Sequence, residues 1–122
     1  MKFQEMTDKH SNYISAYEEN WVKIKNNTYK KSILIFSDEI IQIDSLSQKE
    51  IVNLIINAQK KKNLELVIIA SKRNIELNKL DAYSSIIESQ LGCEFMNLDS
   101  GYRTFNIILS ESREVALLVR FN

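Results

Sequence analysis

Glycine, proline, cysteine and histidine are all scarce in this chain of 122 residues, and each scarcity excludes a class of site. Glycine occurs only at Gly92 and Gly101, and proline is absent. A loop that cradles a nucleotide phosphate needs clustered glycines, because the backbone must approach the phosphate closely. We therefore do not expect nucleotide binding through a Walker or dinucleotide loop.

The chain has one histidine, His10, and one cysteine, Cys93. These two residues cannot supply a structural zinc site, which needs about four ligands. A catalytic histidine needs a nucleophile beside it, and no such pairing is visible around His10. We therefore predict no metal site, no cofactor and no enzyme activity. Because one cysteine forms no intrachain disulfide, we interpret Cys93 as a small buried hydrophobe and expect an intracellular, cytoplasmic protein.

The chain has neither an excess of one charge over the other nor a long apolar run. Sixteen basic residues balance sixteen acidic ones, so no net field attracts nucleic acid or an anionic membrane. No apolar run approaches the roughly 20 residues of a membrane span, and the N-terminus lacks the apolar region of a signal peptide. We expect neither nucleic acid nor membrane as a partner.

Four apolar runs are present instead, at residues 33–36, 66–70, 105–109 and 115–119. One amphipathic stretch separates the first two runs, and a short polar segment separates the last two. We predict that residues 1–122 form a single α/β domain: an N-terminal helix, a β-α-β-α-β core and a C-terminal β-hairpin. Helices would pack on a mixed five-stranded sheet.

The N-terminal helix is predicted over residues 8–27. Tyr13, Tyr17, Trp21 and Ile24 follow one another at spacings of four, four and three, which places them on one helix face. We expect this aromatic face to cover the sheet, and a dimer surface or a ligand wall is the alternative.

Other signals set the remaining elements. Ser47 and Glu50 form a capping-box pattern that begins a helix, which Lys60, Lys61 and Lys62 end. A second helix is predicted over residues 78–91, with Gly92 as a left-handed C-cap. Strands are predicted at 31–36, 64–70 and 93–98, and the hairpin at 103–109 and 114–121. Residues 37–44 carry three isoleucines, so they form either a short extended segment or a lid over the strand ends.

Candidate ligand contacts follow the predicted strands, because such sheets place their ligands in the loops after the strands. Asp38 and Glu39 follow the first strand. They could simply face water at the end of the strand, contact a polar ligand, or bind magnesium. Lys72 and Arg73 follow the second strand, just before a predicted helix. Their side chains could bind an anion together with the helix N-terminus, or they could belong to a loop that only contacts water. The predicted contacts are Ser37, Asp38, Glu39, Ser71, Lys72, Arg73, Tyr102 and Arg103.

The order of these segments resembles the degenerate phospholipase-D-like sensor domain of TrmB-type archaeal regulators and archaeal sensor histidine kinases. The resemblance spans residues 32–121 and rests on the strands 33–36, 64–70 and 93–96, the helices ending near Lys62 and at Leu91-Gly92, and the hairpin 106–118. Catalytic members carry His-x-Lys-x4-Asp before the final turn. Thr104 and Asn106, or Arg103 and Phe105, stand where that histidine and lysine would be. The resemblance therefore implies a non-catalytic sensor or dimerisation module.

Two functions follow from these observations. The first is an intracellular module of a signalling or transcription-regulatory system that senses a small ligand or forms a homodimer. The second is an immunity or antitoxin protein that neutralises a partner protein. An enzyme that uses Asp38, Glu39 or Asp99 as acid or base is the third alternative.

Overall fold

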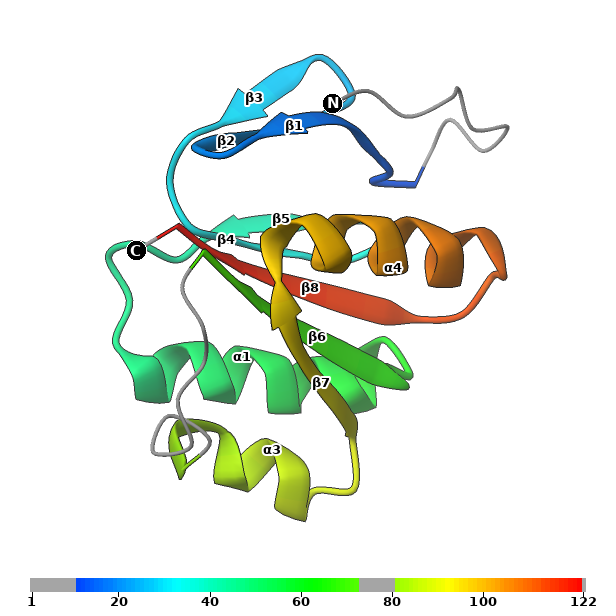
Figure 1. Ribbon diagram of the computed structural model, residues 1–122. Coiled ribbons are helices and arrows are strands. Elements are labelled where there is room, and N and C mark those ends of the chain that lie inside the picture. Colours follow the sequence, from blue (N-terminus) through cyan, green and yellow to red (C-terminus); the bar gives the residue numbers. More distant parts are fainter. Residues whose placement is uncertain (1–10, 73–80, 122) are drawn as a thin grey trace.

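Residues 11–72 and 81–121 are described by the structure, which is a computed structural model (Figure 1). The strands are β1 (Ile14–Glu18), β2 (Trp21–Ile24), β3 (Asn27–Tyr29), β4 (Ile33–Ile35), β5 (Ile40–Gln42), β6 (Leu66–Ser71), β7 (Gly92–Asn97) and β8 (Val115–Arg120). The helices are α1 (Gln48–Lys61), the 3₁₀ turn η1 (Asp81–Tyr83), α3 (Ser84–Glu88) and α4 (Leu98–Ser110).

The strands form two sheets. β1, β2 and β3 make a small antiparallel sheet, and the larger sheet has the order β5-β4-β8-β6-β7. In the larger sheet β6 is parallel to both β7 and β8, whereas β4 is antiparallel to β5 and β8. The predicted α/β class and the mixed five-stranded sheet are therefore confirmed.

Both faces of the larger sheet are covered (Figure 1). Ile33 and Ile35 of β4 pack in a cluster with α4 and the small sheet, whereas Leu34 packs in a second cluster with α1 and α3. A strand that is buried on both faces needs apolar residues at every position, and this need explains the uninterrupted apolar runs at residues 33–36 and 115–119.

The predicted N-terminal helix is wrong within the described residues, because residues 14–29 form β1, β2 and β3. Val22 and Ile24 are buried, whereas Trp21 and Lys23 are half-buried, so the true period of the segment is two. A turn at Glu19 and Asn20 interrupts the helical spacing of the aromatic residues. The first part of that prediction, residues 8–10, lies outside the described residues.

The predicted C-terminal hairpin is also wrong, because its first strand belongs to helix α4, whereas its second strand, predicted at 114–121, is present as β8. The side chain of Asn97 accepts a hydrogen bond from the Ser100 backbone N–H (2.8 Å), which begins the helix at the end of the predicted strand 93–98. The residues that α4 buries recur at helical spacing: Leu98, Gly101, Tyr102, Phe105, Asn106 and Leu109. β8 then pairs with β6 in parallel, so no hairpin forms.

Several local predictions are confirmed. The capping box is present, since the Ser47 side chain accepts from the Glu50 N–H (3.1 Å) and the Glu50 carboxylate accepts from the Ser47 N–H (3.2 Å). Helix α1 ends at Lys61, β6 and β7 lie near their predicted places, and β5 shows that the segment after β4 is extended.

The predicted helix over residues 78–91 is shorter in the described part. Only η1 and α3 are helical there, and residues 78–80 lie outside the described residues. The left-handed residue after α3 is Gln90 (φ 66°), and Gly92 does not have a positive φ.

Candidate functional site

The predicted ligand contacts lie at opposite ends of the strands of the larger sheet. These two ends are called the first and the second edge below. β4 is antiparallel to β8, so the end of β4 lies beside the beginning of β8. Ser37 accordingly donates a hydrogen bond to the Glu114 carboxylate (3.2 Å) just before β8. Ser71, by contrast, ends β6, and Lys72 follows it at the edge where β8 ends. One ligand therefore cannot contact all of the predicted residues.

At the first edge, Asp38 and Glu39 are already paired with a lysine. Lys62 Nζ lies 2.9 Å from Asp38 Oδ1 and 3.2 Å from Glu39 Oε1, and it lies 5.1 Å from the Phe36 ring centroid. The hydrogen bond from Lys62 lowers the pKa of Asp38, and the same contact raises the pKa of Lys62. This cluster is an ion-pair network at the surface in which one lysine is shared by two carboxylates.

At the second edge, three elements line an open cavity of about 260 Å³, here called the edge cavity. The small sheet, the end of β6 and the beginning of α4 supply its walls: Tyr17, Glu18, Glu19, Lys72, Asn97, Leu98, Asp99 and Tyr102. Because β6 and β7 are parallel, their carboxyl ends meet here, and α4 begins directly after β7.

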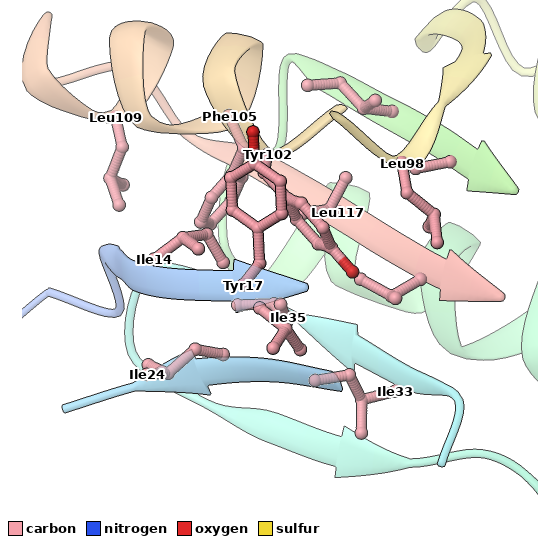
Figure 2. Packing of buried hydrophobic residues seen from close by; sticks show 14 of the residues in the cluster. Ile14, Tyr17, Ile24, Ile33, Ile35, Leu98, Tyr102, Phe105, Leu109 and Leu117 are labelled. Carbon is pink, nitrogen blue, oxygen red and sulfur yellow. The ribbon is translucent and has the colours of Figure 1, made fainter. Parts of the chain in front are cut away.

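Two tyrosines form part of the cavity wall. The ring centroids of Tyr17 and Tyr102 are 4.6 Å apart, and Figure 2 shows both rings packed between β1 and α4. Tyr17 Oη donates a hydrogen bond to Asp99 Oδ1, and Arg103 Nε lies 3.5 Å from Asp99 Oδ2. Burial and the hydrogen bond to Asp99 raise the pKa of Tyr17, which therefore stays a protonated donor at neutral pH.

Tyr102 differs from Tyr17 in its hydroxyl group. The residue is fully buried, and its Oη has no hydrogen-bond partner among the described residues. Burial raises the pKa of Tyr102, with a smaller contribution from Tyr17. A buried hydroxyl that lacks a partner destabilises the fold, so this position carries an energetic cost.

Lys72 ties the end of β6 to the turn between β1 and β2. Its Nζ donates to Asn20 Oδ1 (2.6 Å) and lies 3.7 Å from Glu19 Oε1. The Lys72 ammonium group is therefore already bound by Asn20 and by Glu19, and Glu19 also lines the edge cavity.

The family model described as "Protein of unknown function (DUF498/DUF598)" matches residues 14–119, nearly the whole described fold. The chain belongs to the DUF498/DUF598 family. No curated protein matches the sequence significantly.

Solved structures show the same fold at low sequence identity. A Bordetella parapertussis protein has a TM-score of 0.74 at 17% identity and covers 92% of this chain and 97% of its own. A Bordetella pertussis protein, described as a Mth938-like domain, has a TM-score of 0.72 at 15% identity, with 98% and 92% covered. A Xanthomonas campestris protein has a TM-score of 0.67 at 19% identity, with 95% and 91% covered.

Membership of the DUF498/DUF598 family overturns the resemblance to the phospholipase-D-like sensor domain. That resemblance rested on a pattern of apolar runs, and part of the pattern, the hairpin 106–118, does not exist because residues 98–110 form α4. Buried helices and buried strands produce similar short apolar runs, so such a pattern does not distinguish one α/β family from another.

Of the predicted contacts, Lys72 and Tyr102 line the edge cavity of this DUF498/DUF598 domain. Arg103 lies beside it through Asp99, Ser71 is buried at the end of β6, and Arg73 lies outside the described residues. In the described ranges no group of three metal-ligating side chains occurs, and no helix is long and apolar enough to cross a membrane.

Sequence reasoning missed most of the cavity wall. Tyr17, Glu18 and Glu19 fall in the predicted N-terminal helix, and Asp99 falls between the predicted strand 93–98 and the predicted hairpin. One available signal was Asn97, since a capping residue directly after an apolar strand marks a helix N-terminus at the edge where strand ends meet.

Proposed function

We propose that this domain is a non-catalytic binding module whose small-molecule ligand occupies the edge cavity. The observation that carries the proposal is the position of the cavity, at the carboxyl ends of β6 and β7 where α4 begins. Sheets with parallel strands bind their ligands at this edge.

The size of the cavity supports a small ligand. A volume of about 260 Å³ is slightly below the roughly 300–1,000 Å³ of pockets that hold drug-sized molecules. The walls combine aromatic and apolar groups with a few charged ones, which is the usual composition of a ligand pocket. A compact metabolite therefore fits this cavity better than a nucleotide or a peptide does.

The state of the side chains supports binding without catalysis. The pKa of Tyr17 is raised, so its hydroxyl is a poor nucleophile and a poor base at neutral pH. Asp99 already accepts from Tyr17 and pairs with Arg103. These contacts hold the wall in one geometry, which favours recognition. The single cysteine is consistent with action in a reducing compartment inside the cell.

A ligand screen tests the proposal. The full chain is screened by thermal shift against sugars, amino acids, amines and organic acids, and hits are mapped by amide chemical shifts. Hits should move the amides of residues 17–19 and 97–99. Glu18→Trp, which places a large side chain on the rim, should abolish the hits, whereas Glu39→Trp at the opposite edge should keep them. If no compound moves these amides, or if Glu18→Trp leaves every hit unchanged, the proposal is wrong.

A further inference from the structure

We infer that the edge cavity binds a small uncharged molecule by its carbonyl oxygen, to which the Tyr102 hydroxyl donates a hydrogen bond. This inference rests on the proposed function, since it assigns a ligand class and a contact to the same cavity. Three observations carry it: the unpaired hydroxyl, the direction of the Tyr102 side chain, and the pairing of the charged groups in the cavity wall.

The Tyr102 hydroxyl is a polar group in the protein interior. The residue is fully buried, and its Oη has no hydrogen-bond partner among the described residues. Native proteins pair nearly all of their buried polar atoms. Exceptions that lower stability are expected at functional sites, where a ligand can supply the missing partner.

The Tyr102 side chain extends toward the cavity. Side chains of a helix lean toward its N-terminus, so Tyr102 covers the preceding turn of α4, which holds Leu98 and Asp99. All three residues line the edge cavity. Figure 2 shows the Tyr102 ring reaching from α4 toward the end of β1, with its oxygen on the side where Leu98 lies. The hydroxyl therefore lies at the buried end of the cavity wall.

The charged groups of the cavity wall already interact within the chain. Asp99 Oδ2 lies 3.5 Å from Arg103 Nε. Glu19 lies 3.7 Å from Lys72 Nζ, and Glu18 takes part in an interaction of its own. A charged ligand would have to break such a pair or enter without a counter-charge, and a buried charge without a partner is costly. An uncharged ligand avoids both costs.

The state of Tyr102 favours a ligand that accepts a hydrogen bond. Burial raises the pKa of Tyr102, so the group stays a neutral hydroxyl that can donate. A carbonyl oxygen accepts this bond and brings no donor that would itself need a buried partner. A ligand without such an oxygen would leave the hydroxyl unpaired in the complex and should bind more weakly.

Three probes of four carbons test the ligand class. The full chain is titrated with butan-2-one, butan-2-ylammonium and n-butyrate at millimolar concentrations, and the amide shifts of residues 17–19 and 97–102 are followed. We expect butan-2-one to bind about fivefold more tightly than either charged probe. Added salt should leave its affinity unchanged, because no charge takes part.

A variant without the hydroxyl tests the contact. Tyr102→Phe keeps the ring, so it should weaken butan-2-one binding about fivefold, while the protein stays folded and at least as stable as the wild type. A purely structural role of the hydroxyl would not separate binding from stability in this way. Tyr29→Phe, at a half-buried position of β3, is the matched control and should leave binding unchanged.

Three results would overturn the inference. Equal affinity of butan-2-one for the wild type and for Tyr102→Phe would mean that the hydroxyl pairs only with water. Charged probes that bind as tightly as butan-2-one would contradict the ligand class, and silence of butan-2-one would contradict both parts. The proposed function is decided separately, by the broader ligand screen and by Glu18→Trp.

Discussion

At the scale of single residues, the tyrosine pair beside the edge cavity shows how burial and hydrogen bonding act separately. Tyr17 and Tyr102 pack against each other in one cluster, so their rings contribute similar apolar contacts. Their hydroxyl groups differ, because Tyr17 donates to Asp99 whereas Tyr102 has no partner among the described residues.

This difference predicts opposite effects for one chemical change. Tyr102→Phe should leave the free energy of unfolding unchanged or raise it by up to about 1 kcal/mol, because it removes an unsatisfied buried hydroxyl. Tyr17→Phe should lower it by about 1–2 kcal/mol, because a hydrogen bond to a carboxylate is lost. Urea unfolding of both variants measures the contrast. Equal destabilisation by the two substitutions would mean that the Tyr102 hydroxyl has a partner.

Gly101 offers a second test at this scale. In the interior of a helix, alanine is ordinarily preferred to glycine by about 1 kcal/mol. A Cβ atom at Gly101, however, would lie 2.6 Å from the Ala70 Cβ of β6, so a backbone or side-chain shift is required. We expect Gly101→Ala to destabilise the protein by about 1–3 kcal/mol in chemical denaturation, because overpacking outweighs helix propensity.

The partner of this contact provides the control. Ala70→Gly removes the opposing Cβ, so the double variant should be more stable than the sum of the two single changes predicts. Ser100→Ala, one position earlier and exposed, should change stability little. Strict additivity of the two substitutions would contradict the proposed clash.

At the scale of the elements, one buried side chain joins α4 to the small sheet. Asn106 accepts from the Ile14 N–H and donates to the Ile14 carbonyl, both at 2.9 Å, in the way a neighbouring strand would. Asn106 is 4% exposed, so water does not replace these bonds. The small sheet is thereby anchored to α4 by hydrogen bonds as well as by apolar packing.

Removing this anchor should be costly. Asn106→Ala leaves two buried backbone groups of Ile14 without partners, and we expect a loss of at least about 2 kcal/mol in the free energy of unfolding. Asn53→Ala on the exposed side of α1 is the matched control and should change little. Hydrogen exchange of the β1 and β2 amides should rise in Asn106→Ala alone, and protection equal to wild type would argue against the anchor.

Elements with local start and stop signals could be predicted from the sequence, and elements without them could not. The capping box of Ser47 and Glu50 marked α1 correctly because its hydrogen bonds lie within one turn. In α4, β-branched and aromatic residues imitate a strand, and burial against β6 and β8 overrides their weak preference. In β1 and β2, the aromatic spacing imitated a helix, although Val22 and Ile24 already alternated with Lys23 and Lys25.

At the scale of the whole molecule, two buried tyrosines and Cys93, which is half-buried and not buried as predicted, determine the expected response to alkaline pH. Burial raises the pKa of Tyr102 above its ordinary value of 10.0 and that of Cys93 from 9.0 to about 11, and the pKa of Tyr17 is raised as well. A group whose pKa is raised on folding stabilises the fold below its unfolded pKa, and this stabilisation is lost as pH rises through the folded value.

We therefore expect the free energy of unfolding to fall steeply above about pH 10, as measured by circular dichroism and urea titration at each pH. Tyr102→Phe should move the alkaline transition to higher pH, because one buried acid is removed. Tyr29→Phe, at a half-buried position of β3, is the matched control and should shift the transition little. An alkaline transition that Tyr102→Phe leaves in place would exclude Tyr102 as a main contributor.

Composition and local pattern were enough to identify an α/β domain, helix α1 and the strands β4, β6, β7 and β8. Burial on both faces of a sheet demands apolar runs, and a cap needs only neighbouring residues. Composition and local pattern also placed Lys72 directly after a strand, whereas Tyr102 was expected at the entry to a hairpin and lies in α4 instead. The edge cavity itself could not be read in this way. Its walls come from β1, from the end of β6 and from the start of α4, which lie far apart along the chain. These residues meet because the parallel pairing of β6 with β7 and β8 brings the strand ends together, and because Asn106 and the two tyrosine rings hold the small sheet against α4.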